Sequence, residues 1–218
     1  MRYNLRQLSK FKSSRDEVIV DLCRGKRVLH VGATDAPYTQ GKLEAGLLLH
    51  QKIGRVADDV LGIDVDEGAI ELLKRNGIGN ILAFDMNQLG GLDYDPDVII
   101  LGETIEHLMN LELALTNLKQ VMGDRTLLVV STPNALWLTK VLHAFLHVEH
   151  QHPDHKVIFS LATLKHLFEF NDLHVREIYY TFLNRRRSGV SKWLKKGFCR
   201  VFVGFSETLL FVVEKNAA

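Results

Sequence analysis

The sequence predicts one α/β domain built on a mostly parallel β-sheet. Short runs rich in valine, isoleucine and leucine alternate along the 218 residues with stretches of helical periodicity, and this alternation is typical of βαβ units. The run Val98–Leu101 is continuously apolar, as a strand buried on both faces must be. At roughly 100–200 residues per domain, and with no repeat or low-complexity linker, the chain suits one large domain.

Seven segments have the pattern of strands, and the last of them follows a basic helical segment, which leaves it free to insert antiparallel. In chain order they are Arg27–Gly32, Val60–Asp64, Asn80–Phe84, Asp97–Gly102, Thr126–Ser131, His174–Thr181 and Thr208–Glu214. Helices are expected between them over Gly41–Arg55, Glu67–Asn76, Leu111–Met122 and Leu161–Phe170.

The composition excludes several classes of protein. Hydrophobic residues make up 46% and charged residues 24%, which rules out a disordered or fibrous chain. Cys23 and Cys199 are the only cysteines, so a disulfide scaffold is excluded and a reducing compartment is favoured. No signal-peptide core is present, and no apolar run reaches the roughly 20 residues that a membrane span needs. We therefore expect a soluble cytoplasmic protein.

Small and acidic residues stand where the first three predicted strands end. In an open α/β sheet, ligands bind beyond the carboxyl ends of the strands. Gly32 allows close approach of a ligand to the backbone, although it is equally suited to a simple turn. Asp64 could accept hydrogen bonds from both hydroxyl groups of a ribose, and Asp85 from an adenine amino group, with Met86 beside the ring. A turn residue is the ordinary alternative for Asp85.

A dinucleotide-binding site is the competing interpretation of these strand ends. It needs three glycines and an acidic residue about 20 residues after them. Here Asp64 follows Gly32 by 32 residues and only the one glycine is present. The spacing disfavours a nicotinamide cofactor.

Together, Gly32, Asp64 and Asp85 resemble the cofactor contacts of class I S-adenosylmethionine-dependent methyltransferases, over about Lys26–Glu214. The resemblance implies a Rossmann-like, doubly wound sheet of seven strands with the last one antiparallel, in a single domain over 1–218. It also implies that S-adenosylmethionine is the cofactor. The residues that it assigns to the cofactor are Gly32, Ala33, Asp64, Val65, Asp85, Met86 and Gly102.

The chain departs from the family's first motif, acidic-x-Gly-x-Gly-x-Gly. His30 stands at the acidic position, and Thr34 and Ala36 replace the second and third glycines, which implies a loop of different shape. The run Val28–Gly32, followed by Leu48–His50, resembles methyltransferases of glycan biosynthesis clusters. That resemblance implies transfer to oxygen of a small molecule or saccharide.

A second constellation combines carboxylates and imidazoles. Glu103, Glu106 and His107 can share one face of a helical turn, and His155 comes later in His-Pro-Asp-His. One interpretation makes His107 or His155, with Glu106, the catalytic groups, since histidine is the natural base near neutral pH. The other makes Glu103, Glu106, His107 and His155 ligands of Mg²⁺ or Mn²⁺. The plain alternatives are a helix cap for Glu106 and packing for His107.

The same constellation resembles two metal-using groups of methyltransferases. RNA 3′-terminal 2′-O-methyltransferases pair Glu-x-x-Glu-His with a later His-x-Asp-His and Lys, which His152–Lys156 matches, but here Val157–Ser160 replaces their Phe-Glu-Trp. Ubiquinone-pathway O-methyltransferases are the other group. Phe159-Ser160 followed by Thr163-Leu164 is most similar to the glycan-type enzymes. The alternatives are therefore a metal-dependent RNA methyltransferase and a non-catalytic nucleotide-binding protein.

Two segments fall outside the strand–helix alternation. Residues 135–158 carry an apolar stripe, which predicts either core packing or a lid over the acceptor site. Residues 185–200 are basic and contain no acid, and a helix is expected over 189–205. Such a segment could contact an anionic membrane surface, a phosphorylated substrate or RNA phosphates, or could lie on the protein by its apolar face. We expect a small-molecule or saccharide acceptor rather than nucleic acid.

Overall fold

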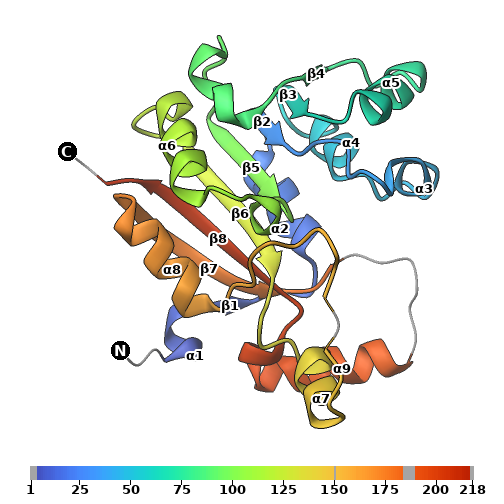
Figure 1. Cartoon of the computed structure of the whole chain (residues 1–218), viewed down its shortest axis with the longest axis vertical. Coiled ribbons are helices and arrows are strands. Elements are labelled where there is room, and N and C mark those ends of the chain that lie inside the picture. The colour runs from blue at the N-terminus through green and yellow to red at the C-terminus, as the bar shows by residue number, and fades with distance from the viewer. Residues whose placement is uncertain (1–3, 150, 184–189, 217–218) are drawn as a thin grey trace.

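The computed structural model describes residues 4–149, 151–183 and 190–216, which form one β-sheet with helices on both faces (Figure 1). The strands are β1 Lys10–Phe11, β2 Arg27–Val31, β3 Asp59–Asp64, β4 Ile81–Ala83, β5 Val98–Gly102, β6 Leu127–Pro133, β7 Leu173–Thr181 and β8 Thr208–Lys215. Their order across the sheet is β1-β7-β8-β6-β5-β2-β3-β4. Every pair of neighbours is parallel except those that include β8. The α/β class and the antiparallel last strand are confirmed.

The expected number of seven strands is wrong, because the described chain forms eight. The additional strand, β1, is two residues long and pairs Lys10 with Tyr179 and Phe11 with Tyr180 at the edge of the sheet. A segment this short and polar has no hydrophobic alternation. Its position comes from the backbone hydrogen bonds that β7 leaves free, which no local pattern reveals.

The helices are α1 Leu5–Leu8, α2 Arg15–Cys23, α3 Thr39–Glu44, α4 Leu49–Gly54, α5 Glu67–Arg75, α6 Leu111–Val121, α7 Leu138–Phe145, α8 Leu161–Phe170 and α9 Val190–Val201, with 3₁₀ turns η1 Met86–Gly91, η2 Ile105–His107 and η3 Val203–Phe205. The expected helix over 41–55 is two helices. Gly46, at φ +65°, ends α3 in a Schellman motif in which its own N–H and that of Leu47 donate to the carbonyls of Leu43 and Lys42.

Helix α2 was not expected from the sequence, although its start carries a helix-capping signature. The Ser14 side chain accepts a hydrogen bond from the Glu17 N–H at 3.3 Å, in a Ser-x-x-Glu sequence. Val18, Ile19 and Cys23 then pack on the sheet. The helix places Arg15 and Asp16 at the carboxyl edge of the sheet.

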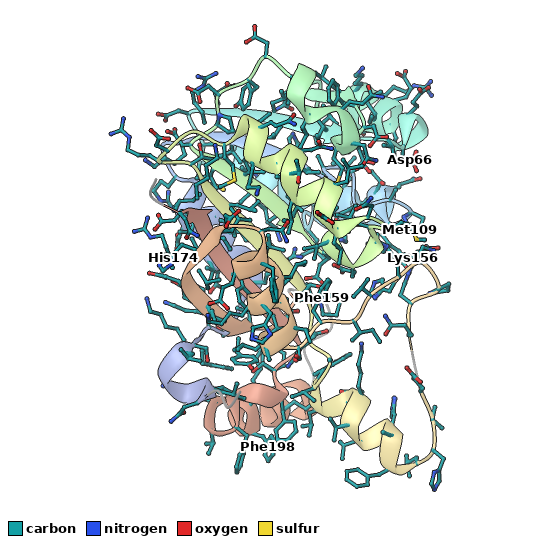
Figure 2. All side chains as sticks on the ribbon, turned by 60° about the vertical axis from the view of Figure 1, so that its left-hand side comes forward. Asp66, Met109, Lys156, Phe159, His174 and Phe198 are labelled. Atoms are coloured by element: carbon teal, nitrogen blue, oxygen red, sulfur yellow. The ribbon has the colours of Figure 1, made fainter. Side chains whose placement is uncertain are left out.

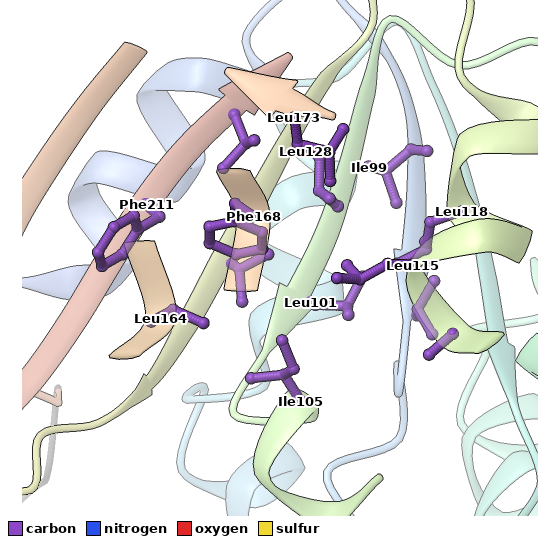
Figure 3. Close-up of a cluster of buried hydrophobic side chains, with 14 of the residues drawn as sticks. Ile99, Leu101, Ile105, Leu115, Leu118, Leu128, Leu164, Phe168, Leu173 and Phe211 are labelled. Carbon is purple, nitrogen blue, oxygen red and sulfur yellow. The ribbon is translucent and has the colours of Figure 1, made fainter. Parts of the chain in front are cut away.

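The core lies on both faces of the sheet. On one face, α6 and α8 cover the central strands, and Leu115, Leu118 and Phe168 meet Ile99, Leu101 and Phe211 (Figure 3). On the other face, α2 and α4 cover β2, β3 and β5. Burial on both sides explains why β5 is apolar at every position. No helix in the described ranges is both long enough and apolar enough to cross a membrane.

The segment between β6 and α8 is anchored at both ends. Asn134 forms an isolated bridge with Phe159, and the Ala135 N–H donates to the Phe159 carbonyl at 2.8 Å. The N–H groups of Lys156 and Val157 donate to the Glu106 carbonyl at 2.7 and 3.2 Å. Within this segment α7 buries none of its residues, so the expectation of core packing for its apolar stripe is wrong.

The basic segment is described only in part. Helix α9 ends at Val201, and η3 follows it, so the expected helix over 189–205 is shorter than predicted. Arg185, Arg186 and Arg187 lie outside the described residues. Lys195 and Lys196 are half-buried and Arg200 is exposed.

Candidate functional site

A cleft of about 830 Å³ opens beyond the carboxyl ends of the parallel strands. Gly32 follows β2, Asp64 ends β3, Gly102 ends β5 and Pro133 ends β6, and all four line it. The order of these strands places their ends side by side. The cleft is therefore where the sequence predicts a ligand.

The loop after β2 depends on glycine at position 32. Gly32 has φ +73°, and a Cβ there would lie 2.7 Å from Thr104 Oγ1. The N–H groups of Gly32 and Ala33 donate to the Ile63 carbonyl at 2.9 and 3.2 Å. Only glycine combines this conformation with such close packing against Thr104, and Gly32 lines the cleft. Ala33 itself is fully buried.

Asp64 holds this loop against the end of β3. Its Oδ2 accepts hydrogen bonds from Thr34 N–H at 3.0 Å and from Thr34 Oγ1 at 2.7 Å. Its Oδ1 accepts from the N–H groups of Val65 and Asp66 at 2.8 and 3.1 Å. Thr34, which stands where the family has a glycine, thus bonds to Asp64, the carboxylate predicted to bind the ribose hydroxyls. The Val65 side chain is 70% exposed.

Asp85 and Met86 lie away from the cleft floor. Asp85 caps η1, where its Oδ1 accepts from the Asn87 N–H and side-chain amide, both at 2.8 Å. Met86 packs into the core with the α6 side chains. Neither belongs to the residues that line the cleft in the described part of the chain. Their contact with the adenine stays a prediction.

His30 and His50 meet in the interior, with their Nδ1 atoms 3.2 Å apart. The Asn80 amide donates to the Val60 carbonyl at 2.8 Å, so its Oδ1 accepts from His50 Nε2–H at 3.3 Å. His50 Nδ1 therefore carries a lone pair and accepts from His30 Nδ1–H. Burial lowers the pKa of both imidazoles, that of His30 well below its ordinary value. The histidine at the family's acidic position thus belongs to a neutral chain of hydrogen bonds.

A buried ion network borders the cleft on the α2 side. Arg15 donates from Nε and Nη2 to Asp16 Oδ1 at 3.0 and 2.8 Å, and Lys52 donates to Asp16 Oδ2 at 2.6 Å. Burial favours protonation of Asp16, but the two cations hold its pKa below the ordinary value. Arg15 Nη1 lies 3.6 Å from Glu103 Oε1. The network fixes a guanidinium group at the cleft wall.

Two glutamates enter the cleft beside η2. Glu103, at φ +57°, accepts from Ser131 Oγ at 3.1 Å. Glu106 Oε2 accepts from Thr132 Oγ1 at 3.0 Å, whereas its Oε1 is buried and has no partner among the described residues. Burial raises the pKa of Glu103, and burial together with repulsion from Glu103 raises the pKa of Glu106 to about 8. Glu106 is therefore a neutral carboxylic acid near pH 7.

Three imidazoles gather next to Glu106. The His107 and His155 ring centres are 4.8 Å apart, and those of His152 and His155 are 5.1 Å apart. His107 Nδ1–H donates to the Asp154 carbonyl at 3.2 Å, which leaves the lone pair on Nε2. Burial lowers the pKa of His107, so the neutral ring prevails at pH 7. His107 is thus available as a base.

His155 has the opposite tautomer. Gln151 Oε1 accepts from Lys140 Nζ at 3.1 Å, so its amide nitrogen donates to His155 Nδ1 at 2.9 Å. The proton of the neutral ring is then on Nε2, 3.9 Å from Glu106 Oε1. Burial and the neighbouring imidazoles lower the pKa of His155 to about 4. His155 therefore acts as a neutral hydrogen-bond donor.

Three of the four expected metal ligands come together. Ligand atoms of Glu106, His107 and His155 lie within 4.8 Å of one another, but Glu103 is not part of this group. The buried Glu106 Oε1 without a partner suits a cation. A metal would, however, need a lone pair on His155 Nε2. The Gln151 amide donates to Nδ1 and so favours the tautomer in which Nε2 carries the proton. The donor set fits a divalent cation only after that amide turns.

Sequence reasoning missed several residues of the cleft wall. Arg15 and Asp16 come from the unexpected helix α2, and the Ser14–Glu17 signature was the signal that could have revealed them. Lys140 and Gln151 belong to the segment that was expected to form a lid. Glu207, just before β8, lines the cleft without any motif in the sequence.

One family model matches most of the chain, and solved structures share its fold. A family model for a methyltransferase domain matches residues 7–178. Solved structures with the same fold include a SAM-dependent methyltransferase from Archaeoglobus fulgidus (TM-score 0.56, 19% identity, 92% of this chain and 94% of that chain covered). A TehB-like SAM-dependent methyltransferase from Corynebacterium glutamicum matches with TM-score 0.55 and 18% identity, over 92% and 86%.

The N-methyltransferase NodS from Bradyrhizobium japonicum is a further structural match, with TM-score 0.54 and 14% identity over 93% of this chain and 95% of that chain. Among curated proteins the search found no match. At these identities the solved structures establish the fold, and the family model establishes the relationship.

Proposed function

The chain belongs to the methyltransferase-domain family, whose methyl donor is S-adenosylmethionine, and we propose that this enzyme transfers the methyl group to a hydroxyl oxygen of a small molecule or saccharide. The observation that carries the proposal is the fixed tautomer of His107, whose Nε2 lone pair is available beside the cleft. A hydroxyl group is a weak nucleophile until its proton is removed, and a neutral imidazole can accept that proton.

The cleft floor fits the cofactor. Gly32 lines the cleft, and Asp64 stands at the end of β3, where ribose hydroxyls would replace Thr34 Oγ1 as a partner of its Oδ2. Arg15, Lys42 and Gly102 line the same cleft. Arg15 and Lys42 pair with Asp16 and Asp35, and the two cations suit the carboxylate of the methionine portion as a further partner. When bound, S-adenosylmethionine supplies a methyl group that is already activated on a sulfonium sulfur.

The residues of this chain then orient the acceptor and move its proton. With the cofactor bound, His107 Nε2 would accept the hydroxyl proton as the acceptor oxygen bonds to the methyl carbon; the carbon–sulfur bond would break, and the sulfonium sulfur would leave as a neutral thioether. His155 Nε2–H offers a hydrogen bond to another acceptor oxygen, and the buried Glu106 lies behind it, with Oε1 3.9 Å from His155 Nε2. Trp137 gives an apolar wall against which the face of a sugar ring can pack. An apolar wall with several fixed polar groups favours a polyhydroxylated acceptor.

A screen for transfer of labelled methyl groups tests the proposal, with sugars, phenols and short RNAs as acceptors. Transfer to a hydroxylated acceptor should proceed, and His107→Ala should lower kcat by roughly 10²–10⁴. The rate should decline with acid only below the ordinary histidine pKa, because burial lowers the pKa of His107. The proposal fails if His107→Ala and His155→Ala both keep full activity.

A metal-dependent RNA 3′-terminal 2′-O-methyltransferase is the second candidate, and the group of Glu106, His107 and His155 favours it. In that case the metal would lower the pKa of a bound ribose hydroxyl. Chelation with EDTA should then abolish activity, and Mn²⁺ or Mg²⁺ should restore it. Activity on saccharides that survives EDTA would exclude this candidate.

A further inference from the structure

The outer side of α7 exposes large apolar side chains. None of the residues of α7 is buried, and Phe145 is 78% and Leu146 70% exposed, with Leu142 beside them. Trp137 and Lys140, at the start of the same helix, line the cleft. The helix is therefore a wall with the cleft on one side and an uncovered apolar surface on the other.

Helix α9 extends this apolar surface. Lys195 Nζ donates to Thr139 Oγ1 at 3.3 Å, which joins α9 to α7. Phe198, Val201 and Phe202 are exposed, and the Phe198 and Phe202 rings lie 4.6 Å apart. Figures 1 and 2 show both helices together at one end of the molecule, with Phe198 at its outer side.

An apolar groove of about 410 Å³ continues the surface beyond α9. Leu5, Leu136, Val201 and Phe202 line it, so it connects α1 and the start of α7 with the end of α9. We name this region, from Leu136 to Leu146 and from Phe198 to Phe205, the α7–α9 face. Contiguous apolar surface of this kind on a protein marks a site of association.

The charge of the α7–α9 face identifies the kind of partner. Neither α7 nor α9 contains an acidic residue, and Arg200 is exposed within the face. Lys195, bound to Thr139, and Lys196, whose Nζ lies 5.7 Å from the centre of the Phe182 ring, are half-buried beside it. A helix with cations on one face and aromatic and aliphatic side chains on another suits the interface of an anionic bilayer. Each cation held near such a surface strengthens binding by about fivefold.

We propose that the α7–α9 face docks on the surface of an anionic lipid bilayer. Phe145, Leu146 and Phe202 enter the headgroup region, and Arg200 pairs with lipid phosphates. Because α7 also forms a wall of the cleft, docking holds the cleft opening next to the membrane surface. The face would then bring the enzyme to acceptors that are attached to lipid.

Co-sedimentation with vesicles tests this proposal on the full chain, without cofactor or acceptor, so that its outcome is independent of the proposed methyl transfer. Vesicles of phosphatidylcholine with about one third phosphatidylglycerol should bind the protein, and pure phosphatidylcholine should bind it at least tenfold less. Binding to the anionic vesicles should weaken as the salt concentration rises.

Variants locate the contact. Phe145→Glu, Phe202→Glu and Arg200→Glu should each lower partitioning to anionic vesicles by roughly tenfold. The matched controls are Phe170→Glu, which changes an 87% exposed phenylalanine on α8, and Lys74→Glu, which reverses an exposed cation on α5. Circular dichroism shows whether each variant folds, and the three face variants are independent of one another.

Three outcomes of the vesicle experiments would overturn the proposal. They are failure of the wild-type chain to bind anionic vesicles, equal binding to neutral and anionic vesicles, and equal loss in the control variants. A stable dimer in the absence of lipid that Phe145→Glu dissociates would assign the face to a second copy of the chain and would also overturn it.

Discussion

The neutral pair of His30 and His50 should make the stability of the fold depend on pH. Protonation of His50 at Nδ1 would replace its lone pair by an N–H group. This N–H would face the Nδ1–H of His30, 3.2 Å away, so that two donors would oppose each other. Both rings are almost fully buried, and burial lowers the pKa of each below its ordinary value of 6.5. In the unfolded chain both imidazoles can accept a proton.

The sign and size of the effect follow from this difference. Since the unfolded state binds more protons below pH 6.5, the free energy of unfolding falls as the pH falls through that range. Each imidazole that stays neutral in the folded protein removes about 2 kcal/mol of stability between pH 7.5 and pH 5. Leucine at both positions cannot ionise, and the exposed Asn80 can bond to water instead of His50.

Urea unfolding followed by circular dichroism measures the free energy of unfolding at about pH 7.5, 6 and 5, values that span the titration of an ordinary imidazole. As the pH falls, the double variant His30→Leu/His50→Leu should gain about 2–4 kcal/mol of stability relative to wild type. Phe170→Leu, at an exposed site on α8 that carries no titratable group, is the control and should keep a constant difference from wild type. A double variant that loses stability with acid as steeply as the wild type would refute the neutral pair.

Three further predictions concern the cleft. Gly32→Ala should lower cofactor affinity in calorimetry and reduce stability by about 1–3 kcal/mol, because its φ is +73° and its Cβ would meet Thr104; unchanged affinity would contradict the assigned floor. Asp64→Asn should weaken cofactor binding roughly tenfold to a hundredfold, whereas Asp66→Asn, at the cap of α5, should not. Glu106→Gln should gain stability over wild type as the pH rises from about 5 to 7.5, since the carboxyl group with a pKa of about 8 stays protonated only in the folded chain. A constant difference in urea unfolding would show that Glu106 is ionised in the fold.

Much of the fold could be predicted from the sequence because its signals are local. The apolar run of β5 and the glycine after β2 reflect constraints at those residues themselves. The two-residue β1 could not be predicted, since only the free edge of β7 determines its place. The split between α3 and α4 was available in principle from Gly46.

The candidate site was predictable only in part. Spacing predicted that Glu103, Glu106 and His107 converge; the structure brings Glu106 and His107 together with His155, and Glu103 is not part of the group. The protonation of each group did not, because it depends on Asp154, Gln151 and other partners that are distant in sequence. Likewise, nothing near His30 indicates that His50 would occupy its Nδ1.

The bridge between Asn134 and Phe159 closes the segment of α7 at its base, and the backbone bonds to Glu106 hold the same base to the turn η2. Residues of this segment that lie outside the cleft can therefore change while the sheet and the cleft floor keep their shape. Lys140, Gln151 and His155 of the same segment border the cleft. Under the proposed function, we expect substitutions at these three positions to alter the choice of acceptor while the binding of the methyl donor is retained.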